Sequence, residues 1–188
     1  DLDMLAATGR LVWVGRGPSG PRDGQIALFR RERVAELQEQ DATEEAVTGL
    51  HALLLDHLRG RGASFLTELV QAAELAGLDA DREDFEAALW DLVWGGRITN
   101  DTFAPLRGLA GAGRRRRGPS FAGGRWSLVS DLLSETPVTR RLLARAQMLL
   151  ERYGLVSREV VQSEGLAGGF AALYPVLRQM EESGRVRR

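Results

Sequence analysis

Three stretches of the chain share one pattern of apolar, polar and glycine positions. In each, two apolar residues stand three positions apart, and a glycine, an arginine and an aliphatic residue follow at positions seven, eight and nine after the first. The stretches are residues 2–11, 89–98 and 177–186. Apolar residues at i and i+3 lie on one side of a helix, and glycine suits the left-handed position just after a helix end. The pattern therefore predicts, three times, a helix that stops at a glycine and turns into an extended segment.

The residues around these stretches predict a larger repeating unit. Gly9, Gly96 and Gly184 are separated by 87 and 88 residues. Amphipathic patterns predict helices over 44–58, 65–76 (with Ser64 as N-cap), 84–94, 139–153 and 158–163, and a further helix leading into Gly184. β-prone runs predict strands over 11–14 and 25–29, with Asp23-Gly24 as the hairpin turn, and over 98–103 and 126–129, joined by a long loop rich in Gly and Arg.

This order of elements, three helices followed by a strand, a wing and a second strand, is the plan of a winged helix. We expect a mainly α fold with small β-wings (α+β), built of tandem winged-helix domains of which both terminal ones are incomplete. The expected division is 1–40 for a helix end with its β-hairpin, 41–133 for a complete winged helix, and 134–188 for the front of another. Trp90 and Trp94 form a second apolar face on their helix, so we expect 1–40 to pack on the middle domain through them.

Composition narrows the chemistry that the chain can perform. Its 25 basic residues are all Arg, against 26 acidic residues, and the net charge is −1. The absence of Cys excludes disulfides, thiolate metal sites and Cys nucleophiles. The absence of Lys excludes a phosphate-binding loop of the Gly-Lys-Ser/Thr type. No apolar run approaches the roughly 20 residues of a membrane helix.

The predicted wing of the middle domain is the best candidate for nucleic-acid binding. Residues 104–125 contain no acid and six arginines, which are Arg107, Arg114, Arg115, Arg116, Arg117 and Arg125. Arg binds phosphate oxygens through forked N–H donors. The alternative is a solvated loop. Because the chain uses Arg for every positive charge, the number of arginines is weak evidence for phosphate binding, and only their positions in the chain favour it.

Other features have a structural interpretation beside a functional one. The acids Asp79, Asp81, Glu83, Asp84 and Glu86 fit helix capping better than acid–base catalysis, and they make the helix over 84–94 a poor reader of DNA. The four tryptophans, Trp13, Trp90, Trp94 and Trp126, fit a core or a domain contact better than base stacking. The last predicted helix offers Tyr174 and Arg178, with Arg185, Arg187 and Arg188 nearby, but Pro175 either delays or kinks that helix.

Two further motifs are typical of ligand sites but lack the required context. Gly15-x-Gly17-x-x-Gly20 follows a predicted strand, yet a second strand follows it, where dinucleotide binding needs a helix. His51 and His57, the only histidines, are six residues apart instead of four, and no third ligand is evident on their helix. We interpret the first as part of a wing and the histidines as structural.

Residues 89–107, residues 151–159, Gly168-Gly169-Phe170 and 174–177 resemble, in the same order, the C-terminal region of bacterial large helicase-related (Lhr-type) proteins. The segment 9–15 with Arg22-Asp23-Gly24 matches as well, whereas the stretch around 108–124 departs from the pattern. The resemblance implies a non-catalytic winged-helix accessory region of a superfamily-2, ATP-dependent DNA helicase linked to DNA repair.

The resemblance also implies where the remaining chemistry lies. ATP and Mg²⁺ would be bound by motor domains outside these residues, so no cofactor and no metal is expected in the chain itself. The expected partners are DNA, single-stranded or as a tailed duplex, and the remainder of the helicase, in the bacterial cytoplasm and away from membranes. Two alternatives stay open: a protein-interaction scaffold without DNA contact, and part of a tandem winged-helix region of the DNA-glycosylase kind.

Overall fold

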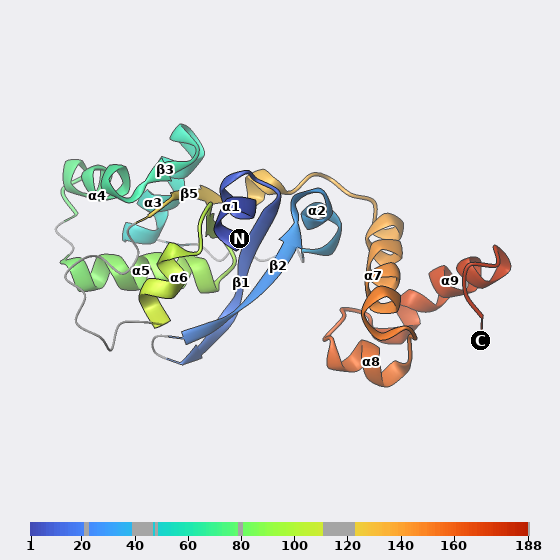
Figure 1. The fold of residues 1–188 in the computed structure, drawn as a ribbon. Helices are drawn as coiled ribbons and strands as arrows, with labels where there is room; N and C mark the ends of the chain where they lie inside the picture. Colours follow the sequence, from blue (N-terminus) through green and yellow to red (C-terminus); the bar gives the residue numbers. More distant parts are fainter. Residues whose placement is uncertain (21–22, 39–46, 48, 79–80, 111–122, 188) are drawn as a thin grey trace. The chain divides into compact units, whose positions relative to one another are not determined.

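The computed structural model describes residues 1–20, 23–38, 47, 49–78, 81–110 and 123–187, which form two compact units (Figure 1). The first unit comprises Asp1–Val34 and Gln40–Leu133, and the second comprises Ala35–Glu39 and Ser134–Arg188. The predicted division into three domains, 1–40, 41–133 and 134–188, stays a prediction about folding units.

The first unit combines short helices with two small antiparallel sheets. Its elements are α1 (Leu2–Ala7), β1 (Leu11–Gly20), β2 (Asp23–Arg30), a 3-10 turn (Arg31–Arg33), the start of α2 (Val34–Leu37), α3 (Gly49–Arg61), β3 (Ser64–Phe65), α4 (Leu66–Leu75), α5 (Arg82–Trp94), β4 (Ile98–Asn100), α6 (Ala104–Ala110), β5 (Arg125–Leu128) and a second 3-10 turn (Ser130–Leu132). Strands β1 and β2 form a hairpin, and the other sheet has the order β3-β5-β4. The sequence of elements from α3 to β5 is that of a winged helix and confirms the predicted α+β class.

The three repeated helices end in the same way, at a glycine with a left-handed backbone. Gly9, Gly96 and Gly184 all have positive φ, at 68°, 66° and 73°. In each case the next arginine donates its backbone N–H to the helix carbonyl five residues before it: Arg10 to Leu5, Arg97 to Leu92 and Arg185 to Met180, at 2.8–2.9 Å. This closes the helix ends in the Schellman arrangement. The three predicted helix ends therefore share one backbone conformation and one hydrogen-bond pattern.

The two predicted strands of the middle wing do pair with each other. Ile98 lies opposite Leu128, Thr99 opposite Ser127 and Asn100 opposite Trp126, in antiparallel register. A third strand that the sequence did not predict, β3, pairs with the other edge of β5. The hairpin of β1 and β2 keeps its register from Leu11 opposite Arg30 to Gly15 opposite Ile26, beyond which the register shifts.

Three local predictions were wrong. Asp23 and Gly24 are not the hairpin turn, because they open strand β2 and pair with Gly20 and Pro18 of β1. Ser64 belongs to β3 and does not cap α4; its hydroxyl donates to the Gly62 carbonyl at 3.0 Å, while Glu68 accepts the Phe65 amide at 2.7 Å. Residues 104–110 form helix α6 instead of the start of a loop, and the Thr102 hydroxyl accepts the Ala104 amide at the start of that helix at 3.3 Å.

The second unit is built on three helices, α7 (Val138–Tyr153), α8 (Arg158–Ser163) and α9 (Gly169–Glu182). Their buried faces meet in one core of apolar side chains, with Ala146, Leu149, Val161, Leu173 and Met180 at its centre. At the end of α7, the Tyr153 hydroxyl and the Arg152 guanidinium both bind Glu164, and this holds the pKa of that carboxyl below its ordinary value. Helix α9 runs through Pro175 without a late start.

Candidate nucleic-acid interface

The wing leaves the three-stranded sheet at a polar turn after β4. The Asn100 side-chain oxygen accepts the Thr102 backbone N–H at 2.9 Å and the Thr102 hydroxyl at 3.0 Å. The Asn100 side-chain amide donates at 3.1 Å to the carbonyl of Gly123, which lies where the chain returns from the wing. A Cβ on Gly124, which has φ +68°, would lie 2.3 Å from the Asn100 oxygen. The two ends of the wing are thus fastened together at one place, which we call the wing base (Asn100, Asp101, Thr102, Gly123 and Gly124).

Arg125, a predicted nucleic-acid contact, lies directly at the wing base. Its backbone N–H donates to Asp101 at 2.7 Å and its Nε donates to the same carboxylate at 2.9 Å. The Arg125 side chain is 52% exposed, whereas that of Asp101 is 26% exposed. Since a guanidinium has five N–H donors, Arg125 still presents donors to solvent while Asp101 fixes its position.

Arg107, on α6, is held in the same way from the N-terminal segment. Its Nη2 lies 2.8 Å from one Asp3 oxygen, and the other Asp3 oxygen accepts the Phe103 amide at 2.8 Å. The Arg107 guanidinium, followed by the Phe103 amide, holds the pKa of Asp3 below its ordinary value. Arg107 and Arg125 therefore flank the turn 101–103, each fixed by one carboxylate. Arg114, Arg115, Arg116 and Arg117 lie outside the described residues, so the six-arginine interface stays a prediction.

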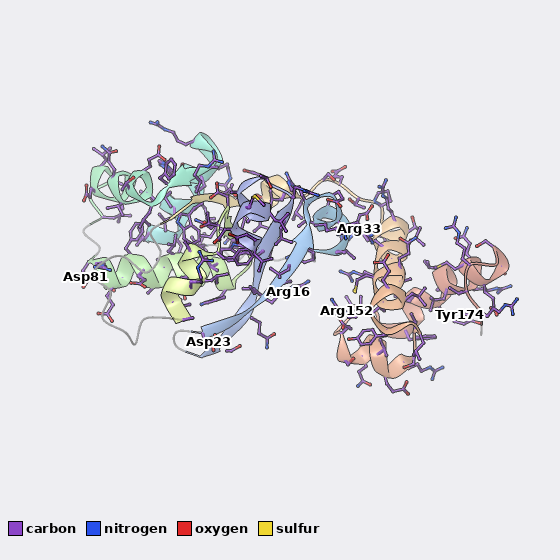
Figure 2. The ribbon with its side chains drawn as sticks, viewed as in Figure 1. Arg16, Asp23, Arg33, Asp81, Arg152 and Tyr174 are labelled. Carbon is purple, nitrogen blue, oxygen red and sulfur yellow. The ribbon has the colours of Figure 1, made fainter. Side chains whose placement is uncertain are left out.

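Helix α5 is the third helix of this winged helix, and it has an acidic first turn and a last turn that the hairpin covers. Asp81 precedes it (Figure 2) and accepts the amides of Glu83 and Asp84 at 2.8 and 2.9 Å, so part of its acidic cluster caps the helix. The last turn is covered by the hairpin, because a Cβ on Gly15 would lie 1.9 Å from the Val93 carbonyl oxygen. The expectation that α5 is a poor DNA reader stays a prediction.

The four tryptophans meet in one aromatic cluster inside the first unit. Trp90 stacks on Trp94 with ring centroids 5.2 Å apart and meets Trp126 edge to face at 6.4 Å; Trp126 in turn contacts Trp13 at 6.5 Å. All four are at least 91% buried. Stacking of these rings on unpaired bases is therefore excluded, and Trp94 lies against Gly24 of the hairpin, where a Cβ would come within 2.5 Å of its ring.

The remaining candidate motifs are the histidines of α3 and the glycines of β1. His51 Nε2 lies 3.3 Å from Asp91 Oδ2 and links α3 to α5. Within the described ranges no group of three or more His, Cys, Asp or Glu side chains could hold a metal ion. Gly15, Gly17 and Gly20 all lie in β1, and a strand follows them. No helix of the described residues is long and apolar enough to cross a membrane.

Sequence reasoning missed the polar residues that hold the wing base. Thr99 donates its hydroxyl to the Trp13 carbonyl, and Trp13 returns a hydrogen bond from Nε1 to the Thr102 carbonyl at 3.0 Å. The signal was present as an unbroken polar run, 99–102, right after a single apolar strand residue. Such a run inside a strand-to-loop junction is typical of side chains that bond to backbone, but its partners 86 and 89 residues away were not deducible.

Comparison with known proteins places these features in context. Residues 135–188 match the family described as the winged-helix domain of large helicase-related protein. The whole chain is 35% identical to the Lhr helicase/uracil glycosylase of Escherichia coli (strain K12) and 32% identical to the Lhr helicase/probable uracil glycosylase of Mycolicibacterium smegmatis. The chain corresponds to 14% of the length of each of these two proteins.

Proposed function

We propose that the chain is a non-catalytic winged-helix accessory region of an ATP-dependent DNA helicase or translocase linked to DNA repair. The proposal is supported by the match of residues 135–188 to the winged-helix domain of large helicase-related protein and by the similarity of the whole chain to two Lhr helicases. It contacts DNA through the Arg-rich wing. The observation that carries this proposal is the wing base, where Arg107 and Arg125 are fixed on either side of one turn.

The wing base supports DNA contact by fixing where the basic segment begins and ends. Asn100 joins the start of the wing to Gly123, so the described residues on either side of the segment 111–122 are held next to each other, and Arg107 and Arg125 lie at the two ends of the basic stretch. Residues 104–125 contain no carboxylate that would repel phosphate. A cluster of this kind binds phosphates without reading sequence, which suits a protein that moves along DNA.

The chemistry of the proposed parent protein lies elsewhere. We place ATP and Mg²⁺ in motor domains of the longer protein and assign no cofactor to the residues of this chain. Its partners in this proposal are single-stranded or tailed duplex DNA and the rest of the helicase, in the bacterial cytoplasm.

The salt dependence of DNA binding tests the proposal. Fluorescence anisotropy with a labelled single strand and a tailed duplex compares the wild-type chain with the double variant Arg115→Ser, Arg116→Ser. The variant's slope of log K against log salt becomes shallower by up to about 1.4 on single strands and about 1.8 on duplex, because two phosphate contacts are lost. The matched control is Arg59→Ser, Arg61→Ser, which removes the same charge at the end of α3. Equal slopes for wild type and wing variant contradict the proposal.

A second candidate function is a protein-interaction scaffold that does not contact DNA. It is favoured by α5, whose exposed residues are largely acidic and whose last turn is buried under the hairpin. It is also favoured by the carboxylates that already bind Arg107 and Arg125. Absence of any salt-sensitive binding by the folded wild-type chain, checked by circular dichroism, supports the scaffold over the DNA contact.

A further inference from the structure

Helices α5 and α9 are equivalent positions of the internal repeat, and this permits a residue-by-residue comparison. Gly96 and Gly184 have the same left-handed backbone after the two helices, and the last helical residues, Trp94 and Glu182, are also 88 positions apart. The inward faces agree, because Phe85 and its equivalent Leu173 are both buried. The shared offset therefore identifies corresponding faces of the two helices.

The face that receives the hairpin in the first unit has a different character in α9. Trp90 and Trp94 are buried on that face of α5, and their equivalents are Arg178 and Glu182. These two side chains are 64% and 62% exposed and form an ion pair at 2.9 Å. Tryptophan that packs against another segment is thus replaced by a solvated pair, so this face of α9 is not built to receive a hairpin as α5 does.

Two aromatic rings and a second arginine lie along the same face of α9. Phe170 and Tyr174, one helical turn apart, have ring centroids 6.3 Å apart at an interplanar angle of 44°. The Arg158 guanidinium, at the start of α8, lies 5.9 Å from the Phe170 ring centroid. Tyr174 is 43% exposed and stands out from α9 in Figure 2. Together Arg158, Phe170, Tyr174 and Arg178 form what we call the α9 face.

Helix α9 is less negatively charged than α5, which favours contact between α9 and a nucleic acid. Residues 80–91, leading into and along α5, contain five acids and one arginine. The equivalent residues 168–179 contain no acid and one arginine, Arg178. The formal charge thus changes from −4 to +1 at corresponding positions. Phosphates are repelled by the first helix and tolerated by the second.

We infer that the α9 face binds unpaired nucleotides of a single strand, as a site separate from the wing. A base stacks on the exposed ring of Tyr174, and the flanking phosphates contact Arg158 and Arg178. Arg178 gives its Nε to Glu182, and its remaining N–H groups are donors for phosphate. Aromatic rings between arginines are the chemistry of single-strand binding, in which stacking tolerates any base.

Binding of a labelled twelve-nucleotide oligo(dT) by the full 188-residue chain tests this site. Tyr174→Ala weakens binding by at least about fivefold, because the loss of one base stack costs about 1–3 kcal/mol. Tyr174→Phe keeps the ring and stays within about twofold of wild type. Phe65→Ala removes an aromatic side chain that is 54% exposed in the first unit, and it leaves binding unchanged. Thermal unfolding by circular dichroism shows that each variant is folded.

An abasic strand of the same length separates stacking from charge. The wild-type chain prefers oligo(dT) to the abasic strand, and Tyr174→Ala loses that preference, whereas the wing variant Arg115→Ser, Arg116→Ser keeps it. Equal affinity of the wild type for the two strands overturns the α9 site even if salt-sensitive binding through the wing persists. A Tyr174→Ala variant that loses only duplex binding also overturns it, and so does a wild type that binds neither single strand, whether or not the wing binds the tailed duplex.

Discussion

The indole N–H of Trp13 donates to the carbonyl oxygen of Thr102 across 3.0 Å, joining the N-terminal hairpin to the wing base 89 residues later. The Thr99 hydroxyl donates back to the Trp13 carbonyl, so the contact is reciprocal. Trp13 is fully buried and also packs on Trp126 and Phe103. The hairpin is therefore part of the structure that fixes the wing and not an appendage to it.

Replacing Trp13 destabilises the first unit, and Trp13→Ala does so more than Trp13→Phe. Trp13→Phe lowers the free energy of unfolding by about 1–3 kcal/mol, because the part-buried Thr102 carbonyl loses its donor. Trp13→Ala lowers it by about 3–5 kcal/mol, because a cavity is added. Urea unfolding monitored by circular dichroism measures both. Leu28→Ala, at the half-exposed cross-strand neighbour, is the control and costs at most about 1 kcal/mol; equal costs for Trp13→Ala and Leu28→Ala contradict the assignment.

The part of the fold that the sequence predicts is the part set by local backbone chemistry. A glycine that must adopt positive φ after an apolar turn gives the three helix ends at Gly9, Gly96 and Gly184, and periodicity gives α8 and most of α7 and α5. Strand β3 was not predictable because two residues, Ser64 and Phe65, carry no periodic signal. Helix α6 was hidden by Pro105 and Gly108, and by the assumption that an Arg-rich stretch is a loop throughout.

The sequence predicts the arginines of the candidate site but not the carboxylates that hold two of them in place. The arginines of the wing are visible in the sequence, but Asp3 and Asp101, which fix Arg107 and Arg125, act across 104 and 24 residues. No rule of spacing connects them. The same holds for the difference between α5 and α9, which emerges only once the structure shows which face the hairpin covers.

Gly15 permits the close approach of β1 to α5. Gly15→Ala places a methyl group 1.9 Å from the Val93 carbonyl oxygen, so the hairpin must shift away from α5. We expect a loss of about 1–3 kcal/mol in the free energy of unfolding, or more. Gly20→Ala, in the same strand but with no atom within 4 Å, is the matched control and changes stability by about 0.5 kcal/mol or less. A Gly15→Ala variant as stable as Gly20→Ala shows that the strand and the helix are not in contact.

The ion pair between Asp3 and Arg107 makes stability depend on pH. The pKa of Asp3 is lower in the folded chain than its ordinary value, which is about 3.9 for Asp. Its contribution is therefore complete above that ordinary value and is lost as the pH falls through the folded pKa. The difference in unfolding free energy between wild type and Asp3→Asn, measured in urea from pH 7 to pH 3, shrinks towards zero at the acid end.

Arg107→Gln is the companion variant for this measurement. If the pair is the cause, Arg107→Gln reduces the pH-dependent difference, and adding Asp3→Asn to Arg107→Gln has a smaller effect than Asp3→Asn alone. A difference between wild type and Asp3→Asn that stays constant from pH 7 to pH 3 contradicts the lowered pKa. Asp3→Asn also affects the wing base, because it removes the carboxylate that fixes the Arg107 guanidinium.

Substitutions at Gly184 test whether a glycine with a left-handed backbone is what ends each repeated helix. Its φ is +73° and no atom lies within 4 Å of a Cβ placed on it, so a substitution there meets backbone strain and no clash. Gly184→Ala costs about 1–2 kcal/mol, the cost of the left-handed conformation for an L-residue, whereas Gly184→Asn costs less because Asn tolerates that region better. Hydrogen exchange of the Arg185 amide, which donates to Met180, measures the opening of the helix end directly. Equal protection of that amide in wild type, Gly184→Ala and Gly184→Asn means that the glycine is not what ends the helix, and that α9 and α5 do not share a helix end set by glycine.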